Sequence, residues 1–178
     1  MDNIREELIR ELKKAEIVSY GDFTLKSGKK SNFYVDLKKV FGNPRILSLI
    51  CENLYNSLTL LDERPNVIAA SGYGGIPIAT LLSVKTGLHL TLVREKTKDH
   101  GENLVIEGYI PKKEDKIIII DDVFSAGTSI NNTIDGLKGT QAKILGAIVV
   151  LNREEAKANF PLKCLISLNE LVEDENKY

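Results

Sequence analysis

The sequence lacks an excess of charge of either sign: 24 lysines and arginines stand against 25 acidic residues, and the formal net charge is -1. Proteins that bind nucleic acids generally show a basic excess or a basic stripe, so this balance argues against such a function. No apolar run approaches the roughly 20 residues that a membrane-spanning helix needs. The N-terminal stretch MDNIREELIRELKKAE has the pattern of a charged amphipathic helix rather than of a signal peptide. We therefore expect a cytoplasmic protein that binds neither nucleic acid nor membrane.

Cysteine is scarce, tryptophan is absent, and the chain shows no repeat or low-complexity tract. Both cysteines, Cys51 and Cys164, lie in apolar segments without metal-ligand spacing, so we expect buried free thiols in a reducing compartment. The chain has 178 residues, 43% of them hydrophobic, which is enough for one domain with a full core and rather short for two. We expect a single domain over residues 1–178.

Segments typical of strands and of helices alternate along most of the chain. Ile4, Leu8, Leu12 and Ala15 share one helical face, which predicts a first helix over residues 3–16. Asn43-Pro44 predicts the start of a long helix that reaches Leu61. The remaining pattern predicts two short strands within 23–37 around a turn at Ser27-Gly28, and further strands at 66–70, 88–94, 105–110, 116–121, 142–152 and 162–168. It predicts helices at 76–86, at 128–137 and from Arg153. Loops are expected at 71–75 and 94–104.

This alternation, with continuous apolar strands, predicts an α/β fold with one doubly wound, mainly parallel sheet covered by helices on both faces. Ligands bind to such sheets outside the carboxyl ends of the strands. Three loops expected at that edge have unusual sequences: 71–75, 94–104 and 121–129. The functional site should lie among them.

The stretch KIIIIDDVFSAGTS joins an apolar strand to two carboxylates and then to small and hydroxyl residues. Backbone N–H groups around Gly127, at the start of a helix, can hold one phosphate group. The loop lacks the lysine and the glycine spacing of a Walker motif. Asp121 and Asp122 would repel an anion, so they suit the hydroxyl groups of a ribose or a divalent cation. A purely structural alternative is that the acids cap a turn and the hydroxyls cap the helix.

The whole string resembles the phosphoribosyl diphosphate signature of the type I phosphoribosyltransferases. The resemblance implies that the acids hold the ribose hydroxyls and that the loop holds the 5-phosphate. It also implies a phosphoribosyltransferase fold with a small N-terminal hood, here residues 1–40, on the side of the base.

Four more segments resemble, in order, the orotate-specific branch of that family. They are FTLKSGKKSNFYVDL (23–37), ASGYGGIPIA (70–79), VREKTKDHGENLVIEG (93–108) and VVLNRE (149–154). The resemblance implies orotate phosphoribosyltransferase activity, Mg²⁺ as cofactor and a homodimer in which the loop 94–104 reaches the neighbouring active site. One alternative is a purine or other pyrimidine phosphoribosyltransferase, which would not be expected to carry FTLKSG or KDHG. The other is a nucleotide-sensing regulator on the same fold that binds RNA or DNA, against which the balanced charge and the intact catalytic loop argue.

The resemblance also implies roles for individual residues. It makes Lys98, His100, Asp121 and Asp122 catalytic, with magnesium held by the diphosphate and Asp121 or Asp122 as candidates to reach it through water. It places orotate at Lys26, Tyr34, Val35, Ser125 and Arg153. It places phosphoribosyl diphosphate at Arg94, Lys98, His100, Asp121, Asp122, Val123, Phe124, Ser125, Ala126, Gly127, Thr128, Ser129, Tyr73 and Gly74. For Arg153 a surface salt bridge with Glu154 or Glu155 is the alternative, and for the cations of loop 94–104 it is plain solvation.

Two positions depart from the family pattern. Glu95 stands where some relatives have a lysine, with Lys96 one place later. Gly74 stands where some relatives carry a lysine in the loop on the diphosphate side. Glycine removes one cation but allows the backbone to approach the diphosphate closely.

Overall fold

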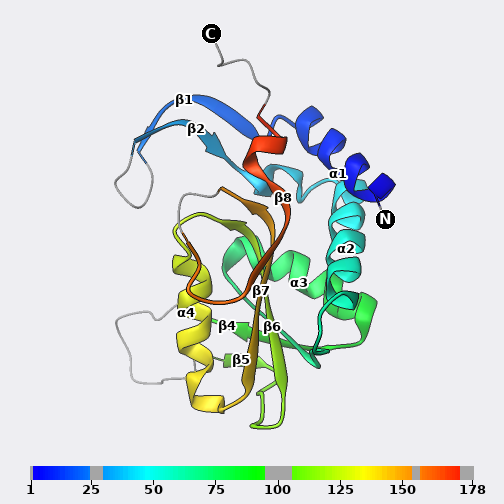
Figure 1. The fold of residues 1–178 in the computed structure, drawn as a ribbon, viewed down its shortest axis with the longest axis vertical. Helices are drawn as coiled ribbons and strands as arrows, with labels where there is room; N and C mark the ends of the chain where they lie inside the picture. Colours follow the sequence, from blue (N-terminus) through cyan, green and yellow to red (C-terminus); the bar gives the residue numbers. More distant parts are fainter. Residues whose placement is uncertain (1, 25–29, 95–105, 154–156, 173–178) are drawn as a thin grey trace.

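A computed structural model describes residues 2–24, 30–94, 106–153 and 157–172. Its centre is a six-stranded sheet with the order β5-β4-β3-β6-β7-β8 (Figure 1). Only the edge strand β5 runs antiparallel to its neighbour, so the expected mainly parallel sheet is confirmed. The strands are β3 (Val67–Ser71), β4 (His89–Val93), β5 (Ile106–Gly108), β6 (Lys116–Phe124), β7 (Lys143–Asn152) and β8 (Leu162–Ser167).

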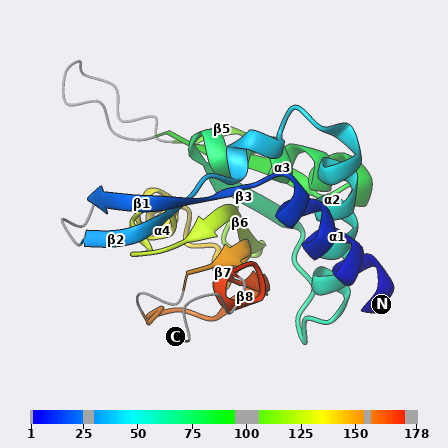
Figure 2. The same cartoon turned by 90° about the horizontal axis from the view of Figure 1, so that it is seen from above.

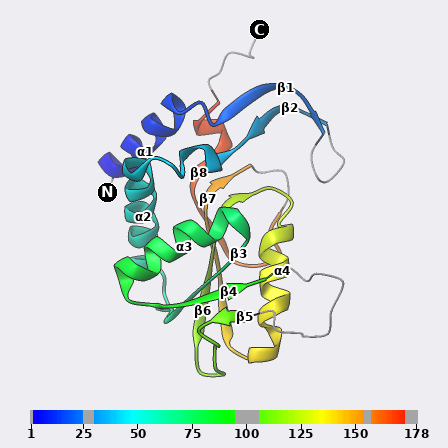
Figure 3. The same cartoon turned by 180° about the vertical axis from the view of Figure 1, so that it is seen from behind.

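Helices cover both faces of this sheet, as the alternating pattern predicts. Helices α2 (Pro44–Thr59) and α3 (Gly72–Thr86) pack on one face, with α1 (Asp2–Lys14) against α2. Helix α4 (Thr128–Leu137) lies on the other face (Figures 1 and 3). Short 3₁₀ helices occur at η1 (Leu37–Val40), η2 (Lys138–Thr140) and η3 (Leu168–Glu170).

The isoleucine run of β6 fills the core on both sides of the sheet. Because successive side chains of a strand point to opposite faces, Ile118 and Ile120 pack in the cluster with α2 and α3, whereas Ile117 and Ile119 pack in the cluster with α4. All four are essentially inaccessible to solvent. The strand continues to Phe124, three residues beyond its expected end, since β7 pairs with it as far as Asn152. Both acids therefore belong to the strand and not to the loop that follows.

A separate hairpin lies over the carboxyl ends of β6 and β7 (Figures 1 and 2). It consists of β1 (Val18–Thr24) and β2 (Lys30–Val35), which pair antiparallel. The two strands expected in 23–37 are present, but the first begins earlier, at Val18. The turn expected at Ser27-Gly28 falls outside the described residues.

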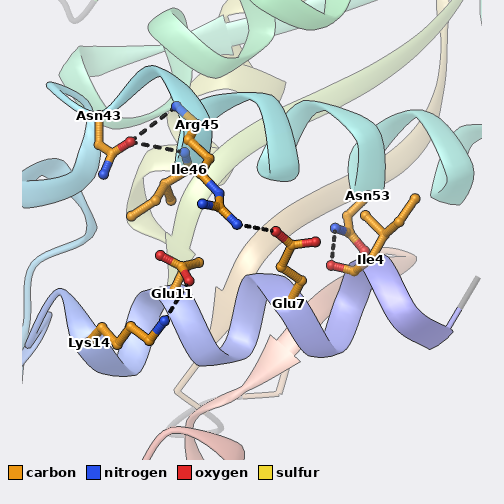
Figure 4. Close-up of polar contacts among 8 residues, drawn as sticks. All are labelled: Ile4, Glu7, Glu11, Lys14, Asn43, Arg45, Ile46 and Asn53. Carbon is orange, nitrogen blue, oxygen red and sulfur yellow. Dashed lines mark hydrogen bonds and ion pairs between the residues drawn. The ribbon is translucent and has the colours of Figure 1, made fainter.

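Polar contacts at the start of α2 join it to α1 (Figure 4). The Asn43 side chain accepts hydrogen bonds from the N–H groups of Arg45 and Ile46, as the Asn43-Pro44 pair predicted. Arg45 pairs with Glu7 of α1 at 2.8 Å. These contacts fix α1 beside α2, on the side of the sheet from which the chain enters the hairpin.

Three expectations were wrong or are only partly tested. Residues 72–75 form the first turn of α3, not a loop. Arg153 and residues 157–161 are not helical, while residues 154–156 of the helix expected from Arg153 lie outside the described part. Neither cysteine forms a disulfide and Cys51 is buried, but Cys164 is exposed because it lies on the edge strand β8. Within the described ranges, no helix is long and apolar enough to cross a membrane.

Candidate active site

The acidic pair lies at the carboxyl end of β6, in the middle of the sheet. Asp121 is 5% exposed and Asp122 is 9% exposed. The N–H group of Asp122 donates to Asp121 Oδ1 at 2.9 Å, and the N–H group of Val123 donates to Asp122 Oδ1 at 2.8 Å. The backbone thus orients one oxygen of each carboxylate.

Burial is the main electrostatic influence on Asp121. Removal from water and the neighbouring charge of Asp122 raise the pKa of Asp121 to about 7, although hydrogen bonds from Ser129 and from the Asp122 N–H group oppose the rise. Near neutral pH the Asp121 carboxyl group can therefore carry a proton. Such a pair can both donate to and accept from the hydroxyl groups of a sugar.

The loop after β6 turns sharply into α4. Gly127 precedes the helix in a left-handed conformation, with φ +77°. A Cβ atom there would lie 2.9 Å from the ring of Phe124, so both the backbone angle and the packing require glycine. No described side chain caps α4. Its first-turn N–H groups, next to Ser125, Thr128 and Ser129, form the kind of cradle that binds a phosphate.

A chain of buried hydroxyl groups supports this loop from below. Thr133 Oγ1 lies 2.8 Å from Ser71 Oγ and 3.0 Å from the carbonyl oxygen of Ser129, and it can donate to either. Ser71 Oγ lies 3.3 Å from Ser129 Oγ, and Ser129 in turn hydrogen-bonds Asp121. The sequence pattern missed Ser71 and Thr133. The spacing of four residues between Ser129 and Thr133 on α4 was the available signal.

The first turn of α3 lies against the acidic pair. Tyr73 is 90% exposed, and Gly74 faces the Asp122 carboxylate. A Cβ atom on Gly75 would lie 2.7 Å from the carbonyl oxygen of Ile120. The two glycines let the helix start unusually close to β6.

Arg153 brings a cation to the same edge from the end of β7. The backbone N–H group of Arg153 donates to the carbonyl oxygen of Phe124 at 2.9 Å, and the Arg153 side chain is buried below the hairpin. The guanidinium lies over the Phe33 ring, 5.2 Å from the ring centre. Next to Phe33, Tyr34 is exposed and Val35 is buried. The hairpin and the sheet therefore meet at Arg153.

A second cation comes from η1, which follows the hairpin, and the sequence pattern missed it. Lys38 Nζ lies 3.9 Å from Asp122 Oδ2 and 3.1 Å from Asp36 Oδ1. Nothing in the local pattern of DLKKV distinguishes Lys38 from Lys39. Only the fold places one of them on the acidic pair.

Of the remaining cations of the predicted site, only Arg94 lies within the described residues. Arg94 follows the carboxyl end of β4 and pairs with Glu107 at 3.0 Å on the surface. Lys26, Lys98 and His100, like Glu95 and Lys96, fall outside the described residues. The structure thus brings together Asp121–Ser129, Gly74 and Arg153, with Tyr34 and Val35 in the hairpin above.

Two further observations concern metal ligands and the location of the site. Among residues of the described ranges, no group of three or more His, Cys, Asp or Glu side chains could hold a metal ion. A groove of about 540 Å³ lies elsewhere, between the end of α1, β1 and Lys39. None of the predicted site residues lines that groove, so its size carries no weight against the chemistry at the acidic pair.

Comparison with known proteins gives a consistent result. Residues 36–177 match the phosphoribosyl transferase domain family. The chain is 36% identical to an orotate phosphoribosyltransferase of Pyrococcus furiosus over 176 residues, covering 96% of each chain. It is 34% identical to one of Methanosarcina mazei over 174 residues, covering 94% of this chain and 91% of the relative. The crystal structure of orotate phosphoribosyltransferase from Aeropyrum pernix superposes with a TM-score of 0.81 at 29% identity, covering 92% of this chain and 95% of the other.

Proposed function

Because this chain belongs to the phosphoribosyl transferase domain family and, within it, to the orotate phosphoribosyltransferases, we propose that its site joins orotate to the phosphoribosyl group of phosphoribosyl diphosphate. The products are orotidine 5-phosphate and diphosphate, and the reaction is a step of de novo UMP synthesis. One observation carries the proposal: the buried pair Asp121 and Asp122 leads into a small-residue loop and a helix start, at the edge where parallel sheets bind ligands.

The donor occupies the loop and the acidic pair. N–H and hydroxyl groups of residues 123–129 surround the 5-phosphate at the start of α4, where the helix dipole favours an anion. Asp121 and Asp122 accept hydrogen bonds from the ribose 2- and 3-hydroxyls. Because these hydroxyls are neutral, the acids can bind them without charge repulsion between acid and hydroxyl.

Orotate lies between the sheet and the hairpin. The hairpin is part of residues 1–40, which form the hood on the base side. The planar guanidinium of Arg153 suits the orotate carboxylate, since its two N–H groups can bind both oxygens at once. Lys26 adds a second cation, and the backbone of Tyr34 and Val35 with the Ser125 hydroxyl bind the ring. Contact with Phe33 holds the Arg153 guanidinium in one orientation.

The diphosphate leaves toward Tyr73 and Gly74 on one side and Arg94, Lys98 and His100 on the other. Negative charge on the leaving oxygen grows as the bond to the anomeric carbon breaks. Cations that close on it therefore stabilise the transition state more than the ground state. His100 contacts the diphosphate and is not a base, because the orotate nitrogen ionises readily. That nitrogen attacks the anomeric carbon with inversion, through an oxocarbenium-like state.

The donor set fits magnesium that arrives with the diphosphate. Mg²⁺ usually binds one or two carboxylates together with substrate phosphates and several waters, and the described chain offers the two carboxylates of Asp121 and Asp122 without a third ligand nearby. When bound, the ion would neutralise charge on the leaving diphosphate. Asp121 or Asp122 would reach it through water.

A homodimer is part of this proposal. Helix α3 is rich in apolar residues, and Tyr73, Leu81 and Val84 remain exposed on it, Val84 to 82%. Such helices are normally covered, and a second copy of this chain suits a face of this kind. The loop 94–104 of one copy would then close over the site of the other. A cytoplasmic location agrees with Cys51 and Cys164 forming no disulfide.

The first experiment mixes the purified protein with phosphoribosyl diphosphate, Mg²⁺ and orotate, and follows the ultraviolet absorbance of orotate. Parallel samples contain uracil, adenine or hypoxanthine, and one contains the Lys98→Ala variant. We expect the wild type to consume orotate. We expect no turnover of the other bases by the wild type and no turnover of orotate by the variant. Turnover of another base would refute the orotate assignment. Donor binding without turnover of any base would favour a nucleotide-sensing regulator.

A further inference from the structure

Lys38 links the hairpin segment to the acidic pair. It lies in the first turn of η1, where the Asp36 carboxylate accepts a hydrogen bond from the Lys38 N–H group at 3.1 Å. The same Asp36 oxygen lies 3.1 Å from Lys38 Nζ. Asp36 therefore orients both the backbone and the ammonium group of Lys38 toward β6.

The ammonium group faces one particular oxygen of Asp122. The N–H group of Val123 engages Asp122 Oδ1 at 2.8 Å, whereas Lys38 Nζ lies 3.9 Å from Oδ2. At 3.9 Å the contact is an ion pair without a hydrogen bond, so the lone pairs of Oδ2 remain available to a ligand hydroxyl. The Asp122 side chain is 13% exposed and that of Lys38 is 48% exposed, so the pair borders the open side of the site.

We propose that Lys38 is a positioning residue for the phosphoribosyl donor: its ammonium group holds Asp122 Oδ2 where that oxygen accepts a ribose hydroxyl. This inference rests on the proposed function. Lys38 also offsets negative charge between Asp36 and Asp122, where an anionic donor must approach. Its loss weakens donor binding and leaves the orotate contacts unchanged, because those lie at Arg153 and the hairpin.

Lys39 provides a matched control. Lys39 carries the same charge as Lys38 and lies in the same helix, η1. Its ammonium group, however, donates to the Glu16 carbonyl oxygen and to Ser19 Oγ, away from the acidic pair. Replacing either lysine with methionine keeps most of the apolar stem and removes the charge. A general effect of lost charge or of a loosened η1 would appear in both variants.

The test compares wild type, Lys38→Met, Lys38→Arg and Lys39→Met. Lys38→Met should raise the KM for phosphoribosyl diphosphate roughly five- to tenfold, the effect of losing one partly buried charged contact, with less than about a twofold change in kcat and in the KM for orotate. Lys38→Arg should restore the donor KM to within about twofold. Lys39→Met should match the wild type.

Calorimetric titration of phosphoribosyl diphosphate measures the same affinity without turnover. It decides the role of Lys38 even if the wild type fails to consume orotate, an outcome that would refute the proposed function separately. Equal donor affinities for Lys38→Met and Lys39→Met would overturn the inference. So would equal rises in both KM values, or a weakened Lys38→Arg variant with a lowered melting temperature, since these indicate a structural role.

Discussion

Gly74 and Asp122 meet so closely that a Cβ atom at position 74 would lie 2.3 Å from Cγ of the Asp122 carboxylate. No side chain fits there unless Asp122 moves. The backbone of helix α3 therefore contacts the acidic pair directly at this position. Gly74 therefore fixes where the Asp122 carboxylate lies.

Replacing Gly74 with alanine should displace Asp122 and lower kcat/KM for phosphoribosyl diphosphate by about 100-fold, the scale of a 1 Å misplacement in an active site. Gly139→Ala is the control, since nothing lies within 4 Å of a Cβ atom there. Steady-state kinetics and thermal unfolding of both variants provide the measurement. A Gly74→Ala enzyme with normal donor kinetics would show that the carboxylate has freedom to move.

The raised pKa of Asp121 makes stability fall with pH over a defined window. The unfolded chain ionises near the ordinary pKa of 3.8, whereas the folded protein keeps the proton to about 7. Between these values the folded state binds more protons, so the free energy of unfolding decreases as pH rises and then levels off above about 7.

The variant Asp121→Asn stays neutral and should lose this part of the pH dependence. Between pH 4 and pH 8, the free energy of unfolding of the variant should rise by on the order of a few kcal/mol relative to that of the wild type. Urea unfolding at several pH values measures the difference. Parallel stability curves for the two proteins would contradict the raised pKa.

Thr133→Val removes a hydroxyl group from the buried chain under the phosphate loop. Ser71 and Ser129 lose a partner inside the protein, so the free energy of unfolding should fall by about 1–3 kcal/mol, and donor affinity should fall with it. Thr59→Val is the control, because its hydroxyl group donates to the Asn56 carbonyl oxygen on an exposed surface. If both variants unfold alike, the buried chain adds nothing beyond a local helix contact.

Arg153→Lys keeps the charge but loses the planar fork and the contact with Phe33. The KM for orotate should rise about tenfold or more, while the KM for phosphoribosyl diphosphate changes little. Arg64→Lys, at an exposed position, should leave both values unchanged. A larger effect of Arg153→Lys on the donor than on orotate would move Arg153 to the sugar-phosphate side.

Several features followed from the sequence because they depend on local chemistry. The alternation of strands and helices, the start of α2 at Asn43-Pro44 and the span of α4 all arise from side-chain periodicity and capping. The acidic pair and the loop around Gly127 are contiguous, so their spacing alone indicated a sugar-phosphate site. The ordered motifs also identified the family, which the relatives confirm.

The tertiary structure decided whatever depends on contacts between distant segments. Pairing with β7 extends β6 to Phe124, and the edge position of β8 leaves Cys164 exposed. Packing of α3 and α4 against the end of β6 creates the Gly74–Asp122 contact and the hydroxyl chain through Ser71 and Thr133. The choice of Lys38 over Lys39 follows from how the hairpin sits on the sheet. Local patterns do not encode these contacts, because each one requires two elements to be packed before either residue has a role.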